Sequence, residues 1–232
     1  MFFCWLQILS NINITINKGQ RIGIIGTTGS GKSTFVDLLM GLISPTSGRI
    51  LVDGDPLVKQ NILPWQKHIA HVSQDVFILD SSFIENIAFG VASTDIDMQR
   101  VELSARIADI DGVIENMDDG YYAMVGERGS RLSGGQRQAV AIARATAFDA
   151  KIVIMDEPTA ALAVKEVGKV LDLIKGLKNL GVGVIVISHR MDDIFTVSDR
   201  VMALFQGTNF AESQLRETSR DEVIGWIMGK KI

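Results

Sequence analysis

The sequence predicts an α/β fold with a parallel sheet. Short β-branched runs bounded by glycine or charge alternate with stretches of helical spacing, which is the pattern of this fold class. The clearest buried-strand candidates are Arg21–Ile25, Ile152–Met155 and Val182–Ile187. With 232 residues, of which 47% are hydrophobic, the chain is long enough to bury a core of its own. We therefore predict one domain over residues 1–232.

Two further regions are expected to decorate this core. The segments Asn11–Ile16 and Arg49–Val52 alternate with a period of two, which favours a small antiparallel β subdomain. From about residue 81 to 147 strand signals vanish and helical spacing dominates, so we expect an inserted helical subdomain there. Residues 1–80 and 148–232 then supply the core and the β subdomain.

One helical face is predicted inside the inserted subdomain. Four apolar side chains recur there at helical spacing, namely Ile107, Ile110, Val113 and Ile114. No internal repeat is found in the chain.

Composition excludes several function classes. The formal net charge is −4, so no global basic field attracts nucleic acid. The single Cys4 excludes an intramolecular disulfide and a cysteine zinc cluster, and we expect a reduced, cytosolic compartment. The longest uncharged opening stretch, Met1 to Asn17, contains several polar residues and falls short of the ~20 apolar residues that a spanning helix needs.

A phosphate-binding loop follows the first predicted buried strand. Its nine residues are Gly26, Thr27, Thr28, Gly29, Ser30, Gly31, Lys32, Ser33 and Thr34, with a helix expected over Phe35–Leu42. They match G-x-x-x-x-G-K-[ST] between a strand and a helix, a context that disfavours a plain glycine-rich turn. Glycines let successive N–H groups surround an anion, while Lys32 is expected to reach the β- and γ-phosphates and Ser33 to ligate Mg²⁺.

Two carboxylates end a second predicted strand. Asp156 and Glu157 follow Lys151–Met155, and ligands of open α/β sheets bind at the carboxyl ends of the strands. Asp156 suits Mg²⁺, and Glu157 is placed to polarise an attacking water molecule. An acid pair after a strand more often caps a helix, but beside a phosphate loop the catalytic interpretation is favoured.

A third motif makes a family resemblance decisive. Ser133, Gly134, Gly135 and Gln136 follow Leu132 and form an anion-receptive helix start with Ser133 as the cap. The sequence LSGGQ at Leu132–Gln136 resembles the signature motif of the nucleotide-binding domains of ATP-binding cassette (ABC) transporters. It lies between the phosphate loop and the acidic strand, as that family requires.

The resemblance covers nearly the whole chain and implies a RecA-like core of the P-loop NTPase type that hydrolyses ATP with Mg²⁺. Gln74 matches the Q-loop glutamine, implied to contact Mg²⁺ and to couple to a membrane domain. His189 matches the switch histidine, implied to hold the γ-phosphate and water. The implied catalytic residues are therefore Glu157, His189 and Gln74, and the implied metal ligands are Ser33, Gln74 and Asp156.

The resemblance also implies partners. Two such domains pair head to tail, as a homodimer or a heterodimer, and each ATP lies between one phosphate loop and the other chain's signature motif. Ser133 and Gly135 therefore serve the partner's ATP. A transmembrane domain or subunit, but no nucleic acid, is implied, with the domain peripheral on the cytoplasmic face of the membrane.

Two positions depart from the family pattern. The family's adenine-stacking aromatic falls at or before Met1, and the sequence does not choose among Phe2, Phe3 and Trp5 as substitutes. The family's D-loop usually ends in Asp, whereas here Ala163 stands in that place. Weaker communication across the dimer is one expected consequence.

The two parts of the chain resemble different branches of the family. Residues 9–131 are similar to exporters, and Val125–Gly129 resembles the exporter X-loop. Residues 135–232 are similar to carbohydrate importers of the ribose, xylose and fructose type. We interpret the chain as a mosaic, natural or engineered, and the alternative is a single lineage that has drifted in both directions.

Four functions remain open from the sequence. Energising export is favoured because the expected membrane-contact surfaces lie in the exporter-like part. Carbohydrate import is the second, and an ABC ATPase acting on nucleic acid or ribosomes is a third that the negative charge disfavours. The fourth is a recombined domain that folds and binds nucleotide with weak or no turnover.

Overall fold

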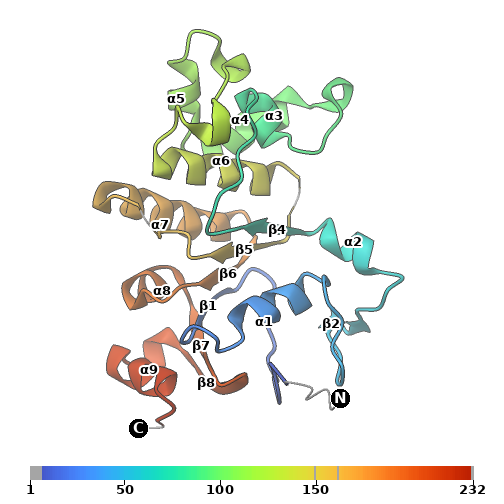
Figure 1. Cartoon of the computed structure of the whole chain (residues 1–232), viewed down its shortest axis with the longest axis vertical. Helices are drawn as coiled ribbons and strands as arrows, with labels where there is room; N and C mark the ends of the chain where they lie inside the picture. The colour runs from blue at the N-terminus through green and yellow to red at the C-terminus, as the bar shows by residue number, and fades with distance from the viewer. Residues whose placement is uncertain (1–6, 149, 161, 231–232) are drawn as a thin grey trace, which may run out of the picture.

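A six-stranded mixed sheet forms the centre of the protein in the computed structural model, which describes residues 7–148, 150–160 and 162–230 (Figure 1). In spatial order the strands are β4 (Ile69–Val72), β5 (Ile152–Asp156), β6 (Gly183–Ile187), β1 (Arg21–Ile25), β7 (Arg200–Phe205) and β8 (Thr208–Gln214). The first five run parallel, and β8 returns antiparallel to β7. The predicted α/β class is confirmed, with one antiparallel edge strand that the sequence analysis did not anticipate.

Helices cover both faces of the sheet. In chain order they are α1 (Lys32–Leu39), α2 (Ile62–Gln66), α3 (Phe83–Ile87), α4 (Met98–Ile107), α5 (Asp111–Glu115), α6 (Gly134–Ala147), α7 (Val164–Asn179), α8 (Met191–Val197) and α9 (Arg220–Ile227). Single 3₁₀ turns lie at Ser93–Asp95, Gly120–Tyr122, Glu127–Gly129 and Leu215–Glu217. In Figure 1, α1 lies on one side of the sheet and α7, α8 and α9 lie on the other.

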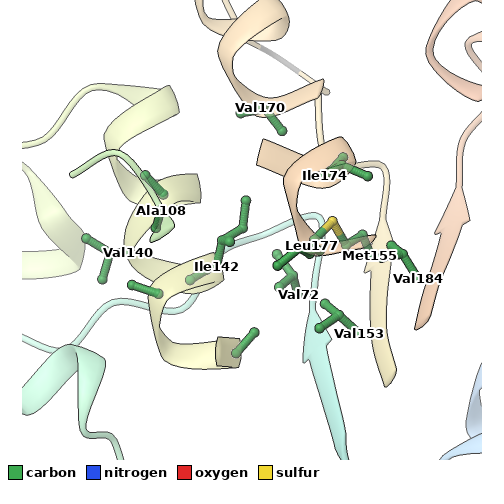
Figure 2. Close-up of a cluster of buried hydrophobic side chains, with 14 of the residues drawn as sticks. Val72, Ala108, Val140, Ile142, Val153, Met155, Val170, Ile174, Leu177 and Val184 are labelled. Atoms are coloured by element: carbon green, nitrogen blue, oxygen red, sulfur yellow. The ribbon is translucent and has the colours of Figure 1, made fainter. Parts of the chain in front are cut away.

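The two faces bury separate sets of side chains because neighbouring strand residues point to opposite sides. On β1, Ile22 and Ile24 pack with Phe35 and Val36 of α1. On the opposite face, side chains of the parallel strands pack with α6 and α7; Figure 2 labels Val72, Val153, Met155 and Val184 beside Ile142, Val170, Ile174 and Leu177. The second cluster continues into the region of α3 to α5.

The predicted single helical face is divided between two helices. Helix α4 ends at Ile107 and α5 begins at Asp111, because Asp109 adopts a left-handed φ of 52° that ends the first helix. Ile110 and Ile114 are nevertheless buried at 1% and 0% exposure. The apolar spacing therefore predicted burial correctly and helix continuity wrongly.

The small antiparallel sheet has different strands from those expected. Strand β2 (Leu51–Val52) pairs with β3 (Asp55–Pro56), whereas Asn11–Ile16 forms no strand. Carbonyl groups of that segment accept side-chain hydrogen bonds instead, from Asn209 to the Asn13 oxygen and from Arg200 to the Thr15 oxygen. Its alternation arises because Ile12, Ile14 and Ile16 pack against the α1 face of the core.

Within the part of the chain that the structure describes, no helix combines the length and the apolar character needed to cross a bilayer.

Candidate functional site

The carboxyl ends of four parallel strands carry most of the predicted site. The neighbours β4, β5, β6 and β1 all end at the same edge of the sheet, because they are parallel and in register. Asp156 is the last residue of β5, and Gln74, His189 and the phosphate loop follow β4, β6 and β1, respectively. Residues far apart in the sequence are thereby assembled along one edge.

The phosphate loop has the geometry of an anion cradle. Gly29 and Gly31 adopt left-handed φ angles of 79° and 101°, which L side chains rarely adopt, so the loop can turn its N–H groups inward. Helix α1 begins directly after Gly31, whose lack of a side chain leaves the first N–H groups of the helix without a cap. The helix thus begins at Lys32, earlier than the predicted Phe35.

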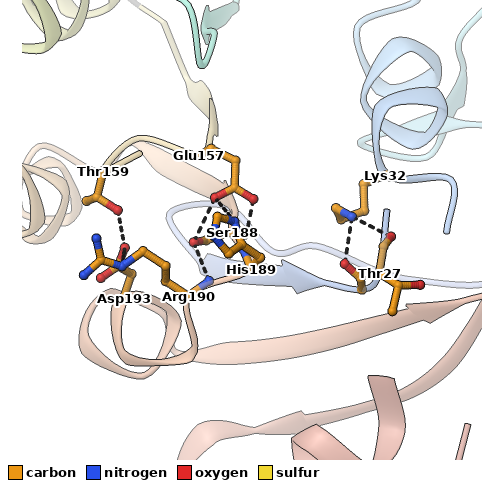
Figure 3. Close-up of polar contacts among 9 residues, drawn as sticks. Thr27, Lys32, Glu157, Thr159, Ser188, His189, Arg190 and Asp193 are labelled. Atoms are coloured by element: carbon orange, nitrogen blue, oxygen red, sulfur yellow. Dashed lines mark hydrogen bonds and ion pairs between the residues drawn. The ribbon is translucent and has the colours of Figure 1, made fainter. Parts of the chain in front are cut away.

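Lys32 folds back over this loop. Its Nζ donates to the carbonyl oxygens of Gly26 and Thr27 at 2.8 and 2.9 Å (Figure 3). Burial lowers the pKa of Lys32, and the negative charges of Glu157 and Asp156 oppose that shift. The ammonium group of Lys32 donates to two carbonyl oxygens, and phosphate oxygens can take the place of these acceptors.

Asp156 lies at the end of β5 and is half-buried. Its pKa is raised by burial and by the negative charge of Glu157, while His71 and Lys32 act in the opposite direction. A carboxylate that is partly desolvated beside a second carboxylate gains from a cation, which relieves both causes of the shift.

Glu157 is held by the segment that follows β6. Its carboxylate accepts hydrogen bonds from the Ser188 hydroxyl at 3.3 Å and from the backbone N–H of His189 at 3.0 Å. The imidazole Nδ1 of His189 lies 2.8 Å from the same carboxylate (Figure 3). The Glu157 side chain is 13% exposed, whereas that of His189 is 69% exposed. The sequence analysis selected these two residues from separate motifs, and the structure brings them into contact.

The backbone at Glu157 is unusual for a non-glycine residue, with φ at 48°. Its N–H donates to the Ile187 oxygen at 2.8 Å, which fixes the turn against β6. Strained, left-handed positions of this kind concentrate at functional sites.

A buried polar contact beneath this site was missed by the sequence analysis. The Thr159 hydroxyl donates to Asp193 of α8, and Arg190 Nε lies 3.5 Å from the same carboxylate (Figure 3). Thr159 and Asp193 are 0% and 1% exposed. Only the motif position of Thr159, two residues after Glu157, could have directed attention to it.

The signature motif begins α6, and it is hydrogen-bonded both within itself and to the start of α7. Ser133 is the N-cap and accepts from the Gln136 N–H at 3.2 Å, while the Gln136 side chain accepts from the Ser133 N–H at 2.8 Å. The Ser133 hydroxyl and the Gly135 N–H both donate to Glu166. The sequence analysis did not select Glu166.

Three predicted features have plainer outcomes. Gln74 is exposed, two residues beyond the end of β4. Phe2, Phe3 and Trp5 lie outside the described residues. Ala163 is the N-cap of α7 with no side-chain hydrogen bond, as an alanine must be.

These groups fit an ATP-binding site that uses Mg²⁺. The glycine cradle and Lys32 supply positive charge and N–H donors for phosphates, and Ser33 and Asp156 offer the oxygen ligands that Mg²⁺ prefers. Glu157 supplies a positioned carboxylate next to these groups.

Comparison with known proteins decides the family. The family described as "ABC transporter" matches residues 9–160, more than half of the chain. The chain belongs to the ABC transporter family. Its fold and relatives are those of the ATP-binding domain of exporter-type transporters, a domain class that hydrolyses ATP.

The relatives are much longer proteins. The ATP-dependent lipid A-core flippase of Ralstonia nicotianae is 39% identical over 200 residues, which are 86% of this chain and 33% of that protein. The β-(1→2)glucan export ATP-binding/permease protein NdvA of Rhizobium etli is 40% identical over 200 residues, with the same two coverages of 86% and 33%. The chloroplastic ABC transporter B family member 29 of Arabidopsis thaliana is 35% identical over 219 residues, 94% of this chain and 33% of that protein. The chain thus spans about a third of the length of these relatives.

A solved structure gives the same result for the fold. A bacterial Atm1-family ABC exporter with ATP bound superimposes with a TM-score of 0.80 and 31% identity, covering 90% of this chain and 36% of that chain.

The mosaic interpretation finds no support in these relatives. Alignments of 200 and 219 residues are longer than either of the two parts into which we divided the chain, so the exporter likeness continues through the expected joint.

Proposed function

We propose that this chain is the ATP-hydrolysing domain that energises an exporter-type ABC transporter. The observation that carries the proposal is the contact of Glu157 with Ser188 and His189 beside Lys32, at one edge of the sheet. A carboxylate held by donors from the segment after a neighbouring strand is oriented to accept a proton from water. The exporter relatives support the direction of transport.

The proposed roles follow the strand ends. The residues that bind ATP phosphates are Gly26, Thr27, Thr28, Gly29, Ser30, Gly31, Lys32, Ser33 and Thr34. Glu157 orients and polarises water, His189 holds the γ-phosphate, and Gln74 senses the site and couples it to the membrane domain. Chemistry then consists of positioning and electrostatic stabilisation, with Lys32 neutralising developing charge.

Mg²⁺ is proposed as the metal, held by Ser33, Gln74 and Asp156. Bound there, the ion neutralises phosphate charge during hydrolysis. The raised pKa of Asp156, caused by burial and by Glu157, supports a cation at this position.

Two chains are proposed to pair head to tail, as a homodimer or with another nucleotide-binding domain. Ser133, Gly134, Gly135 and Gln136 then bind the ATP held by the partner's phosphate loop. A transmembrane domain completes the transporter, and no nucleic acid takes part. The domain is proposed to lie on the cytoplasmic face of the membrane.

The proposed domain division follows from the same roles. Residues 1–232 form one nucleotide-binding domain, with 1–80 and 148–232 as the core and β subdomain and 81–147 as the helical subdomain that carries the signature motif.

Turnover of Mg²⁺-ATP against protein concentration tests the proposal. If each active site needs two chains, the rate at low concentration rises with the square of protein concentration. A linear dependence at concentrations where the chain is monomeric overturns head-to-tail pairing, and absence of turnover at every concentration overturns the assigned chemistry.

A further inference from the structure

The acidic side chain of Glu166 already occupies the signature motif. It lies in the first turn of α7, and one carboxylate oxygen, Oε1, accepts from the Ser133 hydroxyl at 2.6 Å and from the Gly135 N–H at 3.1 Å. The other oxygen, Oε2, accepts from the Ala163 N–H at 3.2 Å. The pKa of Glu166 is lowered, chiefly by the hydrogen bonds from Ser133 and Gly135, so this contact favours the ionised carboxylate.

The fit around Glu166 is close. A Cβ on Gly135 would lie 3.0 Å from the Cβ, Cγ and Cδ atoms of Glu166. The acid therefore lies directly over the second glycine of the motif, and only a residue without a side chain leaves room for it.

The two donors can serve one anion at a time. A hydroxyl and a backbone N–H each carry a single proton, and both are directed to Oε1 of Glu166. A phosphate oxygen arriving at the same donors would meet a carboxylate of like charge within a few ångströms, an unfavourable pair. Carboxylate and phosphate are thus mutually exclusive ligands of Ser133 and Gly135.

One hydrogen bond of Glu166 does not involve the signature motif. This bond, from the Ala163 N–H, is a contact within the first turn of α7. Rotation about the side-chain bonds can keep that helix contact while releasing Ser133 and Gly135. A rotation that keeps only the contact with Ala163 would therefore leave the motif open.

We propose that the Glu166 carboxylate competes with nucleotide for the signature motif of its own chain. When two chains pair, the γ-phosphate of the partner's ATP must displace this carboxylate from Ser133 and Gly135. The inference rests on the proposed head-to-tail function. ATP would then promote pairing in two ways. It lies between the two chains, and it displaces the carboxylate that otherwise occupies the signature motif.

The test compares ATP-driven pairing of variants in which hydrolysis is blocked. The parent is the full chain with Glu157→Gln, and the dimer dissociation constant in Mg²⁺-ATP is measured by sedimentation equilibrium. Adding Glu166→Ala is expected to lower that constant at least about fivefold, since two charge-assisted hydrogen bonds no longer have to be broken. Adding Glu166→Gln, which keeps the shape and removes the charge, is expected to lower it by less.

Asp172→Asn is the matched control. Asp172 lies exposed on the same helix and pairs with Lys175, so its substitution removes the same charge without touching the signature motif. It is expected to leave the dimer constant within about twofold of the parent, as surface charges contribute little.

A double-mutant cycle with Ser133→Ala separates competition from a general effect on folding. Once the Ser133 hydroxyl is absent, Glu166→Ala is expected to lower the dimer dissociation constant much less, because one of the two donors for which carboxylate and phosphate compete has been removed. Thermal unfolding of each variant identifies any that fails to fold, in which case Glu166→Gln carries the comparison.

The outcomes are distinct. If the parent pairs and both Glu166 variants pair equally well or more weakly, the competitor inference is overturned and the proposed function stands. If neither the parent nor any variant pairs in ATP, head-to-tail pairing fails, and the inference fails with it. Tighter pairing of the Glu166 variants, beyond that of Asp172→Asn, supports the inference.

Discussion

The two ends of the parallel sheet differ in how they use their charged residues. At the amino end, Asp199 accepts from Arg21 Nη2 at 2.8 Å and from Lys178 Nζ at 3.0 Å, and its own N–H donates to the Arg21 oxygen. At the carboxyl end, Lys32 lies on carbonyl groups, Asp156 lies beside a second carboxylate, and Glu157 has a left-handed backbone.

The pKa values of the two ends move in opposite directions. Burial by itself would raise the pKa of Asp199, but hydrogen bonds from Arg21 and Lys178 outweigh it and hold the value at about 2. The pKa of Asp156 is raised by burial and by Glu157. The carboxylate at the amino end is thus paired with two cations, whereas Asp156 at the carboxyl end lies beside another carboxylate.

Glu157→Gln should give the largest loss of activity. Removing the proton acceptor is expected to lower ATP turnover by at least about 100-fold, because general-base groups contribute on this scale. ATP binding and the free energy of unfolding should change little, since the amide keeps the shape. Steady-state turnover and nucleotide titration measure this, and normal turnover would show that another group acts as the base.

Asp193→Ala should affect both activity and stability. It leaves the buried Thr159 hydroxyl without its acceptor and Arg190 without its partner, and we expect a loss of about 2–3 kcal/mol in the free energy of unfolding. Turnover should fall as well, because the turn that carries Glu157 loses support. Urea unfolding and turnover are the measurements, with Asp193→Asn, which keeps an acceptor, as the milder control. Equal losses in both variants would contradict the role of the buried hydrogen bond.

Asp199→Asn should affect stability alone. A partly buried carboxylate with two cationic partners is expected to contribute about 1–2 kcal/mol to the free energy of unfolding near pH 7, with turnover unchanged. Because the pKa is lower in the folded state, this contribution is present above the ordinary value near 3.8 and is lost as the pH falls toward about 2. Denaturation curves of parent and variant should therefore converge in that window, and a constant difference down to pH 2 would refute the assignment.

Lys178→Met should give the smallest effect. The Lys178 side chain is 49% exposed, so solvent screens its ion pair with Asp199. We therefore expect the free energy of unfolding to fall by about 0.5 kcal/mol or less. Unfolding in low and high salt measures it, and the difference should shrink as salt is added. A loss as large as that of Asp199→Asn would mean that Lys178, and not Arg21, is the main partner.

The sequence predicted the elements whose pattern is locally complete. Arg21–Ile25 and the phosphate loop combine a β-branched strand, glycines and a helix start within a short stretch, so both strand and loop could be found without tertiary information. Asn11–Ile16 failed because alternation reports which side chains are buried and does not report whether backbone groups pair with a neighbouring strand.

The sequence indicated only those candidate site residues that lie in recognisable motifs. Motif spacing indicated Glu157 and His189, and their contact is consistent with that assignment. Glu166 and Asp193 could not be predicted, because each acts through a partner brought near only by packing of α7 or α8. An acid in the first turn of a helix ordinarily reads as a helix cap, and the contact of Glu166 with Ser133 exists only once α6 and α7 lie side by side.

The position of β1 has a consequence for synthesis of the chain. This strand precedes both of its neighbours in the sheet, β6 and β7, which end at Ile187 and Phe205. Until those residues have been translated, the strand that presents the phosphate loop has no partner on either side. This part of the sheet is therefore completed only after β7 has been made, and pauses or truncations before β6 leave an unpaired apolar strand open to aggregation.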